Sequence, residues 1–132
     1  MFIQNGVEAR CWYAEFQGEG SIDAGGPFRD SLDNIAKELE SSALPLLIKS
    51  PNNRNDHGYY RDAYIFNPDA TSPICLQMIT FFGGLVGYAI MSTSALPIYL
   101  APIIWKTIVG ENLTIDDLKD FDEFSSSALE EL

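Results

Sequence analysis

The hydrophobic pattern predicts an amphipathic helix in the first third of the chain. Within residues 27–41, apolar side chains recur at the three- and four-residue spacing of one helical face. They are Phe28, Leu32, Ile35, Ala36 and Leu39. Asp30 and Asp33 near the start of this segment complement the helix dipole. Before the helix, residues 11–17 alternate and are rich in aromatic side chains, which predicts a strand.

Two more strands are predicted in the middle of the chain. Residues 46–49 and 59–66 carry the apolar and aromatic side chains that strands favour. Residues 50–58 between them are polar and rich in turn-forming residues, so they are predicted to be a loop. Such a connection favours antiparallel pairing. The pattern therefore indicates an α+β fold, dominated by helices, with a small antiparallel sheet.

The longest apolar segment predicts the central helix. Ser72 is a favourable N-cap and Pro73 a favourable first residue, and the helix is expected to reach Met91. It is apolar nearly all round, which predicts a buried position. Gly83 and Gly87 share one face of this helix. That spacing predicts the close approach of a neighbouring helix, either in a protein core or, as in membrane dimers, between spans.

The same segment raises the question of a membrane. Residues 70–105 carry no charge. The continuous apolar piece from Ile79 to Met91, however, is only about 13 residues long, whereas a bilayer needs about 20. A buried core helix is therefore favoured, and no membrane partner is expected. A small membrane-associated protein that uses residues 74–105 is the alternative.

The last third of the chain predicts three short helices. The first spans Pro97 to Val109, where Pro102 should kink it or delay its start, and Gly110 ends it. Thr114 is expected to cap a helix at residues 115–119. Asp120 or Asp122 is expected to begin a final helix that reaches Leu132.

The charge balance narrows the class of partner. The net charge of −11 argues against nucleic acid, because a phosphate-binding surface needs Lys and Arg. Much of the acidity is local, and only Lys119 opposes it there. This pattern is typical of a solvated helical surface, and the alternative is a rim for a basic partner. The acidic residues are Glu111, Asp116, Asp117, Asp120, Asp122, Glu123, Glu130 and Glu131.

Cysteine and histidine side chains give no sign of catalysis or metal binding. Cys11 and Cys75 lie far apart without metal-ligand spacing, and Cys75 is expected to be a small buried hydrophobe. His57 is expected on the surface. No catalytic residue, cofactor or metal is predicted in this chain. Reduced thiols suit a cytoplasmic address, with the nucleus as an alternative.

A glycine-rich acidic loop separates the first predicted strand from the first helix. It lacks the third glycine and the following Lys of nucleotide-binding loops, so a tight structural turn is predicted. Pro27 suits the first turn of the helix. We hypothesise that Asp23 and Arg29 form an ion pair that shapes this loop. The predicted structural residues are Gly18, Gly20, Asp23, Gly25, Gly26, Pro27 and Arg29.

This loop, with the residues around it from Phe16 to Asp30, resembles the opening of the HECT domain of E3 ubiquitin ligases, and most of all the HERC-like members. Later segments resemble that family in the same order. These segments are Leu44 to Asn52, Tyr64 to Pro68, Phe81 to Ile90, Ala95 to Pro97, and Leu113 to Leu118. The resemblance covers residues 12–132.

The resemblance implies that residues 1–132 are part of a HECT domain, in its N-lobe. The E2-docking subdomain and the C-lobe, whose cysteine carries ubiquitin as a thioester, are then expected outside this sequence. The chain alone should be inactive and act as scaffold, with ubiquitin and an E2 enzyme as partners of the whole domain. A truncated lobe could also self-associate. The alternative is a non-catalytic interaction module.

The resemblance also suggests where ubiquitin could bind without a covalent bond. In some family members, the sheet region of the N-lobe contacts a second ubiquitin. The corresponding stretch is residues 59–67. Its candidate contact residues are Tyr59, Tyr60, Tyr64, Phe66 and Asn67.

Overall fold

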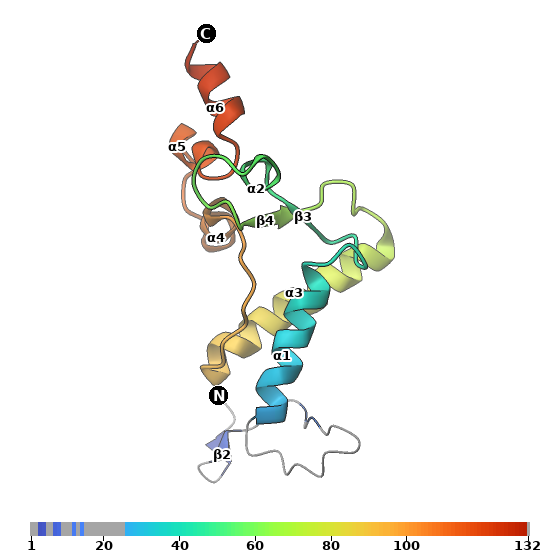
Figure 1. Ribbon diagram of the computed structural model, residues 1–132. Helices are drawn as coiled ribbons and strands as arrows, with labels where there is room; N and C mark the ends of the chain where they lie inside the picture. The colour runs from blue at the N-terminus through green and yellow to red at the C-terminus, as the bar shows by residue number, and fades with distance from the viewer. Residues whose placement is uncertain (1–2, 5–6, 9–11, 13, 15–25, 132) are drawn as a thin grey trace. The chain divides into compact units, whose positions relative to one another are not determined.

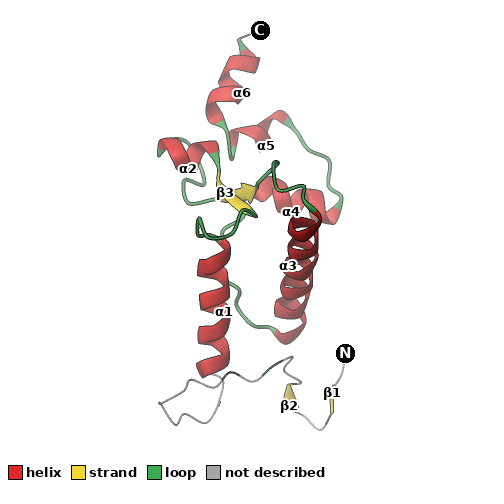
Figure 2. Cartoon of the chain, turned by 90° about the vertical axis from the view of Figure 1, so that its right-hand side faces the viewer, coloured by secondary structure: helices red, strands yellow, loops and turns green. Residues whose placement is uncertain are grey.

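The computed structural model describes residues 3–4, 7–8, 12, 14 and 26–131, and their contacts divide the chain into two compact units (Figure 1). The first unit comprises residues 1–43 and 71–98, and the second comprises residues 44–70 and 99–132. Helices dominate both units, and the strands form short antiparallel pairs (Figure 2). The expected α+β class with a small antiparallel sheet is confirmed.

In the first unit, the strand prediction for residues 11–17 is not met where it can be checked. Trp12 and Ala14 lie outside any strand, and the other residues of that segment lie outside the described residues. A pair that the sequence pattern did not predict lies earlier, where β1 (Ile3–Gln4) pairs with β2 (Val7–Glu8).

The first predicted helix is α1 (Gly26–Leu39), which confirms the amphipathic pattern. Phe28, Leu32, Ala36 and Leu39 are buried, while Ile35 is half-buried at the edge of this face. Pro27 occupies the first turn as expected. The helix therefore turns its apolar stripe inward, because burial removes those side chains from water.

An aromatic cluster joins the parts of this unit. The ring centroids of Trp12 and Phe28 lie 5.1 Å apart, and those of Phe28 and Tyr88 lie 6.0 Å apart in an edge-on arrangement. Trp12 also donates a 3.0 Å hydrogen bond from Nε1 to Ser31 Oγ, which satisfies its polar atom. The cluster ties α1 to helix α3 (Pro73–Ser92), which contributes Tyr88.

Helix α3 (Pro73–Ser92) begins as predicted, with Ser72 Oγ accepting from the backbone N–H of Cys75 and Pro73 in the first turn. Its predicted burial, however, is wrong. Only a stripe of Cys75, Phe82, Leu85 and Ala89 is buried. Five large apolar side chains on the helix are exposed, namely Ile74, Leu76, Phe81, Ile90 and Met91. An all-round apolar pattern predicts burial only where packing surface surrounds the helix, and the described residues supply it on one side.

The glycines of α3 correct a second expectation. A Cβ atom built at Gly83, Gly84 or Gly87 would meet no described heavy atom within 4 Å outside the local helix backbone. The predicted close approach of a neighbouring helix at Gly83 and Gly87 is therefore wrong for this structure.

The length argument against a membrane span is also wrong. Helix α3 has 20 residues and contains an 18-residue window with a mean hydropathy of 1.8, and it is the one helix among the described residues that is long and apolar enough to cross a bilayer. Length and composition are weak evidence, because core helices of soluble proteins meet the same criteria. Here 22% of the apolar window is buried.

In the second unit, the sheet prediction is confirmed in its pairing and corrected in its extent. Strands β3 (Leu47–Lys49) and β4 (Tyr64–Phe66) are antiparallel, with Ile48 opposite Ile65. Residues 99–101 add to the other edge of β4, where Tyr64 donates to the carbonyl of Tyr99 at 2.7 Å.

The segment between the two strands differs from the predicted loop and strand. Pro51–Asn55 forms a short helix, α2, capped by Ser50, whose Oγ accepts from the backbone N–H of Asn53. Residues 59–63 form a turn instead of the start of the strand. Gly58 and Tyr60 both have a positive φ, which takes the backbone out of the extended region.

The remaining helices follow the sequence closely. Helix α4 (Pro102–Val109) starts at Pro102, so the proline delays the start, and Gly110 ends it at φ 75°. Helix α5 (Ile115–Lys119) follows Thr114 as expected. Helix α6 (Glu123–Glu130) begins after Asp122, which accepts from Ser125 through both carboxylate oxygens.

Candidate functional site

The predicted contact residues fall into two groups in the second unit. Tyr59 and Tyr60 lie on the turn before β4, and their exposed fractions are 68% and 51%. Tyr64 and Phe66 lie on β4 at alternate positions and are half-buried. Exposed aromatic side chains are well suited to protein recognition, because they offer a large apolar area with a polar tip. Only the two turn tyrosines are strongly exposed.

Asn67 has a structural role at the end of β4. Its Nδ2 donates to the carbonyl of Pro45 at 2.9 Å, and its Oδ1 accepts from the backbone N–H of Asp69 at 3.0 Å. Its backbone N–H also donates to the carbonyl of Leu46. These bonds hold the turn after the strand, and Asn67 is thereby engaged within the fold.

The turn that carries the tyrosines has an unusual backbone. Tyr60 has φ 47°, in the left-handed region that non-glycine residues seldom adopt. Its carbonyl accepts from the N–H of Ala63 at 2.9 Å, which closes the turn. A strained residue persists only where its surroundings hold it in place.

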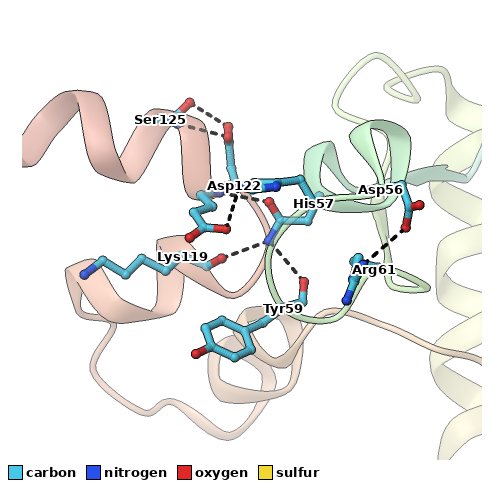
Figure 3. Close-up of polar contacts among 9 residues, drawn as sticks. Asp56, His57, Tyr59, Arg61, Lys119, Asp122 and Ser125 are labelled. Carbon is cyan, nitrogen blue, oxygen red and sulfur yellow. Dashed lines mark hydrogen bonds and ion pairs between the residues drawn. The ribbon is translucent and has the colours of Figure 1, made fainter.

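Asn52 supplies that support. Its side chain is fully buried, and Nδ2 donates to the carbonyl groups of Tyr59 at 3.1 Å and Lys119 at 2.9 Å (Figure 3). Its Oδ1 accepts from the backbone N–H of Glu123 at 2.9 Å. A buried amide with these partners is satisfied, and a buried polar group without them would be costly.

The backbone of Asn52 makes the same connection. Its N–H donates to the carbonyl of Phe121 at 3.0 Å, and its carbonyl accepts from the N–H of His57 at 3.1 Å. One residue of α2 thus holds both the turn that precedes Tyr59 and the corner between α5 and α6.

His57 is exposed as predicted and packs beside this junction. Its Nε2 lies 3.4 Å from Glu123 Oε2, and its ring centroid lies 5.3 Å from that of Phe124. Phe124 is itself 58% exposed. The exposed surface around the turn at residues 59–63, the tyrosine turn, therefore includes side chains of α6. Nearby, Arg61 and Asp56 form an exposed ion pair with a distance of 3.7 Å (Figure 3).

An ion pair between half-exposed Lys106 and buried Asp117 links α4 to α5. Lys106 Nζ lies 2.6 Å from Asp117 Oδ1, and the other carboxylate oxygen accepts from the N–H and hydroxyl of Thr114. The hydrogen bond from Lys106 lowers the pKa of Asp117 most, and the backbone bond from Thr114 adds to it. The same contact raises the pKa of Lys106.

The acidic surface is only partly neutralised. Lys119 Nζ lies 2.6 Å from Glu130 Oε1 and 3.8 Å from Asp116 Oδ1, and the hydrogen bond with Glu130 chiefly raises the pKa of Lys119. Glu111 and Glu131 are exposed. The acidic side chains of residues 111–131 therefore suit a basic partner better than an acidic one.

The glycine-rich loop can be checked only at its end. Gly18, Gly20, Asp23 and Gly25 lie outside the described residues, and so does the hypothesised ion pair of Asp23 with Arg29. Gly26 and Pro27 begin α1, and Arg29 is exposed on that helix.

The expectation for Cys75 is confirmed, because its exposed fraction is 7%. Cys11 lies outside the described residues. Among the residues that the structure does describe, no group of three His, Cys, Asp or Glu side chains could hold a metal ion.

Sequence reasoning missed three residues that organise this surface. Asn52 stood in a segment predicted to be a loop, where a polar side chain carries no signal of burial. Glu123 and Phe124 come from a helix far along the chain, and no local pattern links them to His57. The Ser50–Pro51 pair, which is the same N-cap signal as Ser72–Pro73, could have revealed α2.

Comparisons with known proteins place this architecture in a family. The family model described as the HECT domain (ubiquitin-transferase) matches residues 34–132. The chain belongs to the HECT-domain family. The match includes the tyrosine turn, Asn52 and the α5–α6 corner.

Individual relatives agree with this assignment. The chain is 40% identical over 114 residues to E3 ubiquitin-protein ligase HERC2 of Mus musculus, covering 86% of this chain. It is 39% identical over 111 residues to the probable E3 ubiquitin-protein ligase HECTD4 of Homo sapiens, covering 81% of this chain. The HERC-like resemblance is confirmed. The chain spans only 2% and 3% of the lengths of these relatives.

Proposed function

We propose that this chain serves as a scaffold segment in the N-lobe of a HECT ubiquitin ligase. The family membership supports this role, as does the exposure of Tyr59 and Tyr60. A ligase that contains it would receive ubiquitin from an E2 enzyme onto a cysteine outside this sequence and pass it to a substrate lysine. The comparisons do not favour the alternative, a non-catalytic interaction module with a HECT-like half domain.

The tyrosine turn is the part of the chain that we propose to contact ubiquitin. The observation that carries this proposal is the exposure of Tyr59 and Tyr60 on a turn whose strained backbone is held by Asn52. A preformed aromatic surface loses little entropy on binding, which favours affinity. The acidic side chains of α6 complement a partner surface that combines apolar and basic residues.

A titration of the labelled chain with ubiquitin, followed by amide NMR, tests this proposal. We expect saturable shifts at residues 57–67 and at the start of α6. Tyr59→Ala should weaken binding at least fivefold. Phe81→Ala is the matched control, because Phe81 is also an aromatic residue with an exposed fraction of 61%, but it lies in the other unit. Equal loss in both variants, or no saturable shift in the wild type, would reject the site.

A reaction with E1, an E2 and ubiquitin tests the scaffold role. Cys75 should form no reductant-sensitive ubiquitin adduct, since burial keeps its thiol from reacting. An adduct on Cys75 would contradict the scaffold role.

We also propose that the chain self-associates through α3 at high concentration. The exposed apolar side chains of α3, including Ile74, Leu76, Phe81, Ile90 and Met91, support this. Light scattering across a concentration series should show a mass increase, and a constant monomer mass would reject self-association.

For the ligase as a whole we propose a cytoplasmic or nuclear location, which imaging of the tagged protein would test.

A further inference from the structure

Asn52 connects two surfaces that are remote in sequence. On one side its Nδ2 and its carbonyl bind the turn, through the carbonyl of Tyr59 and the N–H of His57. On the other side its Nδ2 and Oδ1 bind the corner between α5 and α6, through the carbonyl of Lys119 and the N–H of Glu123 (Figure 3). Both sets of bonds converge on one fully buried residue.

Close packing leaves this amide little freedom to move alone. A Cβ at Gly58 would lie 2.8 Å from Asn52 Nδ2, so the turn backbone lies directly against the amide. A displacement of the amide toward the carbonyl of Lys119 in the α5–α6 corner would lengthen its bond to Tyr59, because one nitrogen serves both carbonyl groups. Hydrogen bonds in such a network act together more than as independent pairs.

We propose that Asn52 is a positioning residue that couples the start of α6 to the conformation of the Tyr59–Tyr60 turn. A change at the α5–α6 corner then alters how the tyrosines are presented. The effect on ubiquitin affinity rests on the proposed function. The coupling itself does not, and it can be measured without a ligand.

The most direct test changes the α6 side and reads the turn. Glu123→Pro removes the N–H that Asn52 Oδ1 accepts and places the proline ring against that oxygen. Glu123 is the first residue of α6, a position where proline is compatible with the helix. Glu123→Ala is the matched control, because it also removes the carboxylate near His57 but keeps the N–H.

We expect Glu123→Pro to shift the amide signals of Tyr59 and Tyr60, and to weaken ubiquitin binding about fivefold relative to Glu123→Ala, the effect of about one hydrogen bond. Unchanged turn signals in a folded Glu123→Pro variant would overturn the coupling. If the wild type does not bind ubiquitin, the proposed function is wrong. The amide signals of the turn in Glu123→Pro still show whether the coupling exists.

Native-state hydrogen exchange of the wild type gives a second test in case Glu123→Pro does not fold. The amides of His57 and Glu123 both donate to Asn52. If one junction holds both, they should become exchangeable through the same opening event, with equal opening free energies across denaturant concentrations. Independent opening of the two amides would overturn the proposal.

Discussion

Gly58 lies against the buried side chain of Asn52, so that a Cβ at Gly58 would lie 2.8 Å from Asn52 Nδ2 and 2.6 Å from Glu123 Oε2. The carboxylate is the end of a flexible side chain and can move away. The amide is held by its hydrogen bonds to Tyr59, Lys119 and Glu123 and cannot. This contact makes Gly58 the position where the junction is most sensitive to added volume.

We predict that Gly58→Ala destabilises the chain by about 2–4 kcal/mol, from left-handed strain of about 1–2 kcal/mol and from overpacking. Gly110→Ala is the matched control, because Gly110 has a similar φ of 75° and a Cβ there meets no described heavy atom within 4 Å. Gly110→Ala should lower the free energy of unfolding only by the cost of the left-handed backbone, about 1–2 kcal/mol. Urea unfolding of both variants measures the difference, and equal losses would show that the contact with Asn52 is unimportant.

In contrast, Gly84→Ala in α3 should stabilise the chain by up to about 1 kcal/mol. Gly84 lies inside a helix and is exposed, and alanine is the better helix former. Thermal unfolding at low protein concentration measures the gain. A loss at all concentrations would indicate packing against this face that the structure does not contain.

Local signals explain why the sequence predicted most helix ends. Ser72 with Pro73, Thr114 before α5, and Gly110 after α4 each act within one turn of the chain, and the structure has them as predicted. Pro102 fixed the start of α4 by the same kind of local effect. Such caps need no knowledge of the rest of the fold.

Local sequence signals could not predict burial or long-range contacts. The apolar pattern of α3 could not show how much packing surface surrounds it, and the exposed face corrected that prediction. The aromatic run from Tyr59 favoured a strand, but the positive φ values of Gly58 and Tyr60 produced a turn. Asn52 joins segments distant in sequence, so its role is visible only in the fold.

The core of the first unit yields a further prediction. Leu32 has an exposed fraction of 0%, so Leu32→Ala should cost about 2–5 kcal/mol through lost burial and a residual cavity. Leu76→Ala on α3 is the control, because its exposed fraction of 55% predicts a change within about 0.5 kcal/mol. Chemical denaturation of both variants provides the comparison, and similar losses would contradict the described core.

The Lys106–Asp117 pair makes stability depend on pH at both ends of the scale. The native pKa of Asp117 lies below its ordinary value of 3.8, chiefly because of the Lys106 hydrogen bond. Its contribution is complete above pH 3.8 and disappears as the pH falls through the lowered native pKa. The native pKa of Lys106 lies above its ordinary value of 10.5. Its contribution is complete below pH 10.5 and is lost as the pH rises through the raised value.

We therefore predict that the urea concentration at the unfolding midpoint decreases as the pH is lowered below 3.8. Asp117→Asn should make this decrease less steep, because the neutral amide cannot titrate. Asp69→Asn is the control, since Asp69 is exposed and forms no ion pair among the described residues. Asp69→Asn should show the same dependence of the urea midpoint on pH as the wild type. The test lies in the difference between the two variants. An equal slope in both would show that the Lys106–Asp117 contact does not stabilise the fold.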